Sequence, residues 1–161
     1  MTRKPLSVFD AAVGYLARRS HSRRELKNKL FRKGFPGREI YQTLDRLEEL
    51  GYIDDKKFAF EYARYRLRQS PRGLKVLTME LLQRGIAREI TNEVLQEVFE
   101  EFPEEDLVAN LVEKWSRVRG GDFTRDDITK LARSLARKGF SWDVIHRQID
   151  ALVPIEPSAE D

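Results

Sequence analysis

The sequence predicts an all-α protein made of three tandem three-helix repeats. One ten-residue phrase occurs three times, at Leu26–Phe35, Leu77–Ile86 and Leu131–Phe140. Each copy holds a Leu-x3-Leu pair, typical of one helix stripe, followed by a cation, a glycine and an apolar residue, which mark a helix end. The glycines of the phrase are 51 and 54 residues apart, which suits a unit of about three short helices. No stretch shows the alternation of apolar and polar residues typical of a half-buried strand.

This spacing divides the chain into repeats at 1–53, 54–102 and 103–153, with an acidic tail at 154–161. Short helices joined by tight turns give each repeat a helix-turn-helix-like character. Because such repeats stack on their neighbours, we expect an elongated, curved array that offers a binding surface.

The first repeat contains signals for three helices. Ser7 suits the N-cap of a helix that ends near Arg19. Ser22 and Glu25 have capping-box spacing for a second helix that ends at Gly34. Pro36 suits the first turn of a third helix, which ends at Gly51. The expected inward stripes are Phe9, Ala12, Val13 and Leu16, then Leu26, Leu30 and Phe31, then Ile40, Leu44 and Leu47.

The second repeat begins at two adjacent acids, Asp54 and Asp55. We interpret them as helix caps, because neighbouring residues on a turn rarely converge on one reacting atom. The middle helix is expected to open at Ser70-Pro71 and to end at Gly85, and the third to end at Phe102-Pro103. The expected inward stripes are Phe58, Ala59, Tyr62, Ala63 and Leu67, then Leu74, Leu77 and Leu81, then Ile90, Val94 and Val98.

The third repeat follows the same plan. A flexible loop at Arg119–Phe123 precedes a helix-start signal at Thr124–Asp127, and Ser141 suits the cap of the last helix. The expected inward stripes are Leu107, Leu111, Val112 and Trp115, then Leu131 and Leu135, then Ile145, Ile149 and Leu152.

Charge is distributed unevenly along the chain. The net charge is +6 over residues 1–50, +1 over 51–100 and −4 over 101–161. Arg18–Lys33 holds eight cations and one acid, and a second basic stretch follows at Arg64–Lys75, whereas Glu89–Glu113 holds nine acids and no Lys or Arg. A solvated helix face is the alternative, but we favour an anionic partner because acids to balance these cations are missing locally. The candidate binding residues are Arg18, Arg19, Arg23, Arg24, Lys27, Lys29, Arg32, Lys33, Arg64, Arg68, Arg72 and Lys75.

Residue types for catalysis or metal binding are scarce. The chain has no cysteine, and its two histidines, His21 and His146, lie far apart without metal-motif neighbours, so we interpret both as solvated. Motifs for phosphate-binding loops, serine nucleophiles and zinc proteases are absent. The sequence therefore predicts a binding protein without a cofactor rather than an enzyme.

The N-terminus lacks the apolar segment of a secretory signal, and no later run is long enough to span a bilayer. We therefore expect a cytoplasmic protein without membrane contact. Because the array already repeats internally, we expect a monomer.

A specific motif spans the boundary between the first two repeats. It reads Leu47-x3-Gly51-Tyr52-Ile53-Asp54-Asp55-x2-Phe58-Ala59, and it follows Tyr15-Leu-Ala-Arg-Arg19 and Ser22-x2-Glu25-Leu26-x3-Leu30. Glu80-Leu81-x2-Arg84-Gly85-Ile86 and Leu135-Ala-Arg-Lys138-Gly139-Phe140 recur in register. With this combination, the chain resembles the RecX family of bacterial recombination regulators over nearly its whole length. One departure is Ser70-Pro71-Arg72-Gly73-Leu74, where the family more usually has a Gly-Pro arrangement.

The resemblance implies tandem three-helix repeats that bind the RecA recombinase filament on single-stranded DNA. It also implies that the protein lies in the filament groove and inhibits the RecA ATPase, strand exchange and filament growth. The implied partners are the RecA filament and its single-stranded DNA, and weak direct DNA binding is compatible with the basic residues. Two other functions stay open: a self-sufficient helix-turn-helix-like DNA-binding protein, and a helical adaptor for another protein.

Overall fold

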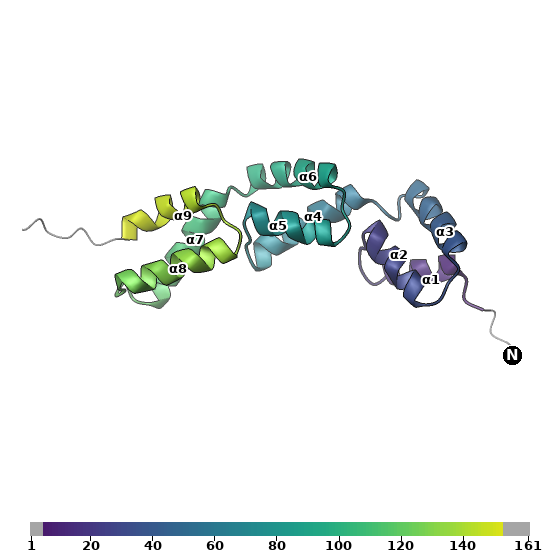
Figure 1. The fold of residues 1–161 in the computed structure, drawn as a ribbon, viewed down its shortest axis with the longest axis horizontal. Coiled ribbons are helices and arrows are strands. Elements are labelled where there is room, and N and C mark those ends of the chain that lie inside the picture. Colours follow the sequence, from purple (N-terminus) through teal and green to yellow (C-terminus); the bar gives the residue numbers. More distant parts are fainter. Residues whose placement is uncertain (1–4, 153–161) are drawn as a thin grey trace, which may run out of the picture. The chain divides into compact units, whose positions relative to one another are not determined.

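A computed structural model of the 161-residue chain describes residues 5–152. The described residues form nine α-helices and one short 3-10 helix, and no strand occurs among them (Figure 1). This confirms the all-α prediction; the predicted acidic tail lies outside the described residues. The helices are α1 Val8–Leu16, α2 Arg23–Arg32, α3 Gly37–Glu49, α4 Asp55–Gln69, α5 Leu74–Gln83, α6 Arg88–Glu101, α7 Glu104–Val118, α8 Arg125–Arg137 and α9 Trp142–Ile149, then η1 Asp150–Leu152.

The predicted caps set most of the helix starts. The Ser7 hydroxyl accepts from the Asp10 amide, 3.0 Å away, and the capping boxes that begin at Ser22 and Thr124 are both complete. Ser141 caps α9. α1 ends at Leu16 rather than near Arg19, and Pro36 is the N-cap of α3 rather than a residue of its first turn.

The two adjacent acids cap two different helices. Asp54 accepts from the Lys57 amide at the start of α4, with a distance of 3.0 Å. Asp55 accepts from the backbone amide of Arg23, the first residue of α2, at 2.8 Å. The capping interpretation of this pair is confirmed, and the second carboxylate also ties α4 to the start of α2.

Glycines end the helix that carries the repeated phrase in all three repeats. Gly34, Gly85 and Gly139 have φ values of 87°, 87° and 91°. This left-handed conformation favours glycine because it has no Cβ. The three predicted helix ends are confirmed.

The start of α5 differs from its prediction. α5 begins at Leu74 rather than at Ser70-Pro71, and Leu74 is 48% exposed instead of inward-facing. The cause is a tertiary contact: the Gly73 amide donates to the carbonyl of Lys138 at the end of α8, with a distance of 2.9 Å. Because the chain before Leu74 is bonded to another helix, it does not wind into α5.

The chain packs as two compact units. Among residues 5–152, the first unit consists of 5–64 together with Thr78–Leu95, and the second of Tyr65–Leu77 together with 96–152. α1, α2 and α3 surround a core in the first unit, and α7, α8 and α9 pack together in the second. Fully buried or nearly buried members of these cores are Leu26, Leu30, Ile40, Leu44, Leu47, Leu135, Ile145 and Ile149.

Besides Leu74, two further expected inward residues, Val13 and Phe31, are exposed instead. Val8 and Ala11 occupy the buried positions of α1, so its inward stripe is shifted by one residue. Within the range that the structure describes, no helix combines the length and apolar character that a bilayer crossing requires.

Candidate partner-binding surface

The structure divides the predicted basic segment of α2 into cations that hold the fold and cations that remain available. Arg23 belongs to the first group: its Nη2 donates to Asp45 Oδ1 and its Nη1 to Glu48 Oε2, each at 2.6 Å. Both acids come from α3. The acids that are missing near Arg23 in the sequence are therefore supplied by a neighbouring helix.

Arg24 is also used inside the first compact unit. Its Nη2 donates to the carbonyls of Leu82 and Gln83 at the end of α5, the first of them 3.0 Å away. A guanidinium on these carbonyls interacts favourably with the negative end of the α5 dipole. We therefore assign Arg24 to the packing of α2 against α5.

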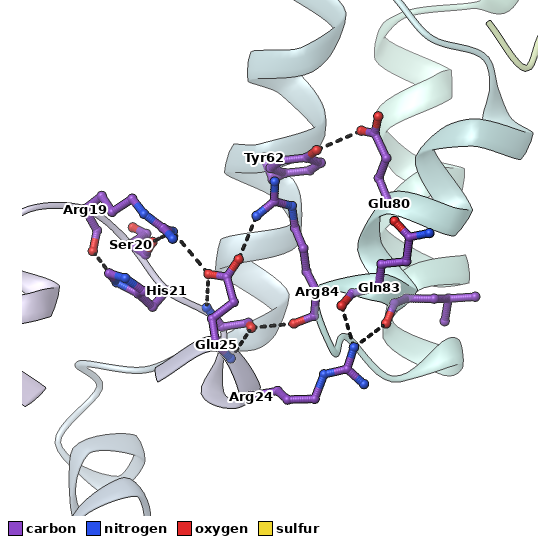
Figure 2. Close-up of polar contacts among 11 residues, drawn as sticks. Arg19, Ser20, His21, Arg24, Glu25, Tyr62, Glu80, Gln83 and Arg84 are labelled. Atoms are coloured by element: carbon purple, nitrogen blue, oxygen red, sulfur yellow. Dashed lines mark hydrogen bonds and ion pairs between the residues drawn. The ribbon is translucent and has the colours of Figure 1, made fainter. Parts of the chain in front are cut away.

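Figure 2 shows the ion-pair network beside this contact. Glu25 accepts from Arg19 Nη1 at 3.1 Å and from Arg84 Nη1 at 2.6 Å. Partial burial alone would raise the pKa of Glu25, but the hydrogen bonds and charges of Arg19 and Arg84 outweigh it and lower the pKa. The Arg84 guanidinium also lies 4.3 Å from the ring centre of Tyr62, whose hydroxyl donates to Glu80 at 2.8 Å.

The remaining five cations form what we call the α2 basic surface: Arg18, Lys27, Lys29, Arg32 and Lys33. Within residues 5–152, none of the five pairs with a carboxylate. Aromatic rings accompany them: Lys29 and Lys33 lie 4.9 and 5.6 Å from the ring centre of Tyr15. Tyr41 is 49% exposed, with Lys27 at 6.0 Å and an edge-on contact to the exposed Phe31. Uncompensated cations beside exposed rings suit phosphates, bases or acidic protein surfaces.

The second basic stretch does not belong to this surface. Arg64 lies in the first compact unit, 5.1 Å from the ring of Phe60, whereas Arg68, Arg72 and Lys75 lie in the second. Arg68 lies over Phe102 at 5.8 Å, Arg72 donates to Ser70 and Pro71, and Lys75 is exposed. The twelve predicted residues thus fall into two compact units, and a binding role for them stays a prediction.

Sequence reasoning missed two cations that the structure places at helix contacts, Arg84 and Lys138. Both occupy the cation position of the repeated phrase, directly before its glycine. Arg84 binds Glu25, while the Lys138 carbonyl receives the Gly73 amide. The repeated phrase was the available signal for these two contacts, although Lys33, at the same position of the first repeat, is exposed.

The interpretation of His21 as solvated is wrong. Its side chain is buried, with only 4% of the residue exposed, because the segment before α2 packs into the first compact unit. Its Nδ1 lies 2.9 Å from the carbonyl of Arg19, so Nδ1 carries the proton, and the buried Nε2 has no partner among the described residues. Burial, followed by the nearby charge of Arg19, lowers the pKa of His21.

The burial of His21 predicts a pH-dependent stability. Because its folded pKa is below the ordinary value of 6.5, the unfolded chain takes up the proton first as the pH falls. The free energy of unfolding should decrease from about pH 7 downward until the folded pKa is reached. Urea unfolding at several pH values should show a shallower decrease for His21→Phe. His146→Phe, at the chain's other and exposed histidine, should keep the wild-type slope; equal slopes for all three proteins would contradict the prediction.

Within residues 5–152, no group of three or more His, Cys, Asp or Glu side chains is placed to hold a metal ion. The α2 basic surface stays the candidate for partner binding in the first compact unit.

Comparisons with known proteins agree with this helical organisation. Three family models match, described as RecX, first, second and third three-helix domain, at residues 9–47, 54–95 and 104–149. A regulatory protein RecX of Prosthecochloris aestuarii is 37% identical over 94% of this chain and 95% of that protein. The regulatory protein RecX of Ectopseudomonas mendocina is 35% identical over 91% of this chain and 95% of that protein. A crystal structure of RecX from Lactobacillus salivarius matches with a TM-score of 0.78 and 29% identity, covering 90% of this chain and 94% of that one.

Proposed function

The chain belongs to the RecX family, and from that premise we propose that it binds the RecA recombinase filament on single-stranded DNA. Binding would inhibit the RecA ATPase, strand exchange and filament growth. The proposed partners are the filament and its DNA strand, and the protein acts by occupying a surface rather than by catalysis. We also propose that it works as a monomer in the cytoplasm.

The α2 basic surface is the observation that carries this proposal. A filament on DNA presents DNA phosphates, and five cations without carboxylate partners complement such a surface. The rings of Tyr15 and Tyr41 lie beside the lysines and add contact area at little cost in side-chain entropy. The surface therefore supports binding to a large anionic partner.

A self-sufficient helix-turn-helix reader of duplex DNA is less well supported. α3 is the helix that would enter the major groove, and its exposed side includes Glu39, Glu48 and Glu49. Arg46 on the same helix lies 5.2 Å from the ring of Phe9, which keeps it against α1. Acids on a groove-facing helix would repel the phosphates of a duplex.

The proposal predicts a direct effect on the recombinase. DNA-dependent ATP hydrolysis by RecA should fall several-fold when the protein is added at saturating concentration over a preformed filament, because a bound regulator restrains filament turnover. The assay measures phosphate release against protein concentration, with bovine albumin as the added-protein control. An unchanged rate at saturation would refute the proposed function.

A further inference from the structure

The helices that carry the repeated phrase meet in the same way twice. At the first junction, the start of α2 contacts the end of α5, and Ser22 Oγ donates to the carbonyl of Arg84. At the second junction, the start of α5 contacts the end of α8, and the Gly73 amide donates to the carbonyl of Lys138 at 2.9 Å. Ser22 and Gly73 are equivalent in the repeat, as are Arg84 and Lys138. Each junction lies within one compact unit.

The charge at the two junctions differs. At the first, Arg84 is neutralised by Glu25, whose side chain is only 17% exposed. The equivalent position at the second junction is Val76, which lies so close to Gly139 that a Cβ on that glycine would sit 2.6 Å from its Cγ2. Lys138 therefore occupies the place of Arg84 without the acid that Arg84 has.

Further cations are added at the second junction. Arg72, which is equivalent to the buried His21, is oriented by donating Nη1 to Ser70 Oγ at 2.9 Å and to the Pro71 carbonyl at 3.1 Å. Burial, and then the positive charges of Arg72 and Arg66, lower the pKa of Lys138. In the described part of the chain, neither Arg72 nor Lys138 pairs with a carboxylate. Half-buried like charges oppose folding, so this arrangement indicates a missing anion.

We propose that Arg72 and Lys138 form an anion site that holds a phosphodiester group of a single DNA strand. An exposed ring favours single-stranded DNA over an acidic peptide as the ligand. Tyr65 is 63% exposed near the C-terminal end of α4, in the same compact unit as Arg72. Arg68 follows it by one helical turn, so a ring for base stacking and cations for the backbone lie close together. This site would extend DNA binding to the second compact unit. It rests on the proposed function only in that the RecA filament supplies the DNA strand.

Direct binding tests the site without the recombinase. The full-length protein is titrated into fluorescein-labelled thirty-nucleotide oligo(dT), and affinity is followed by anisotropy at several salt concentrations. Arg72→Gln and Lys138→Gln should each weaken binding about tenfold, and each should reduce the salt dependence by about one phosphate contact. Arg133→Gln, which removes an exposed cation of α8, should bind as the wild type does. Equal losses at all three positions would show general charge attraction and overturn the site.

A second variant separates anion binding from folding. Val76→Glu restores the acid found at the first junction, so its carboxylate should neutralise Lys138. The site should then no longer contribute to DNA binding. The thermal unfolding midpoint should be no lower than that of Val76→Gln. Val76→Gln should retain wild-type affinity. Equal DNA affinity for Val76→Glu and Val76→Gln would overturn the proposal. So would a Val76→Glu protein that loses RecA inhibition but keeps its DNA affinity, because the ligand of the site would then be an acidic protein surface. The DNA-binding assay contains no recombinase. It therefore tests this site even if the protein proves to have no effect on ATP hydrolysis by RecA.

Discussion

Replacing Gly73 with alanine is expected to lower the thermal unfolding midpoint by about 5–10 °C, which corresponds to about 2–3 kcal/mol of overpacking in a protein of this size. An added Cβ would lie 2.2 Å from the backbone carbon and oxygen of Gly139 and 2.3 Å from the Phe140 amide nitrogen. All three atoms belong to the backbone, so no side chain can rotate away. The contact between the start of α5 and the end of α8 would have to open, and the hydrogen bond from Gly73 to Lys138 would lengthen.

Circular dichroism would measure the midpoint, and hydrogen exchange would locate the damage. Faster exchange is expected in the second compact unit, at 65–77 and 96–152, with little change in α1–α3. Gly14→Ala is the matched control, because nothing lies within 4 Å of its added Cβ and Gly14 is inside α1. That change should stabilise the protein by about 0.5–1 kcal/mol. A Gly73→Ala midpoint equal to that of the wild type would show that the close contact is not maintained.

Reversing Lys27, Lys29 and Lys33 to glutamate is expected to weaken binding to the RecA filament by about a hundredfold, if each reversal costs about 1 kcal/mol at the interface. These lysines belong to the α2 basic surface and have no carboxylate partners among residues 5–152. Their loss should therefore leave the ion pairs of the fold intact. Thermal unfolding should change little, because the substitutions remove only contacts between these lysines and the rings of Tyr15 and Tyr41.

The choice of residues matters for this experiment. Reversing Arg23 or Arg24 would also place an acid beside Asp45 and Glu48, or against the carbonyls at the end of α5, so lost binding would be confounded by damage to the fold. The matched control reverses Lys114, Arg133 and Arg137, three exposed cations of α7 and α8, and changes the net charge by the same amount. If the control loses as much affinity as the test variant, then net charge and not the α2 basic surface governs binding.

The local parts of the fold were predictable from the sequence. The Ser22–Glu25 capping box, the caps at Asp54 and Asp55, and the glycine ends at Gly34, Gly85 and Gly139 all have their signals within a few residues. Two of the predictions that were wrong have causes distant in the sequence. α5 begins late because Gly73 binds Lys138, and His21 is buried because the segment before α2 packs against other helices.

The candidate surface could be predicted only as a set of cations. In the sequence, Arg18–Lys33 contains a single acid, so all eight cations looked equally available. The structure places Arg23 on two acids of α3 and Arg24 on the end of α5, which leaves a smaller α2 basic surface. Conversely, in the sequence Lys138 is an ordinary helix-terminal cation. In the structure, burial and the nearby charge of Arg72 lower its pKa.

By itself, the sequence determined the helices, their ends, the three repeats of the phrase and the family, because helical periodicity, capping and glycine conformation depend on near neighbours along the chain. Only the tertiary structure decided which charges are neutralised. Arg84 and Lys138 both stand directly before the glycine of the phrase, yet Arg84 pairs with Glu25, whereas Lys138 has no carboxylate partner among the described residues and lies near the charge of Arg72. The physical reason is that an ion pair depends on the distance between side chains from different helices, which the packing of the repeats sets.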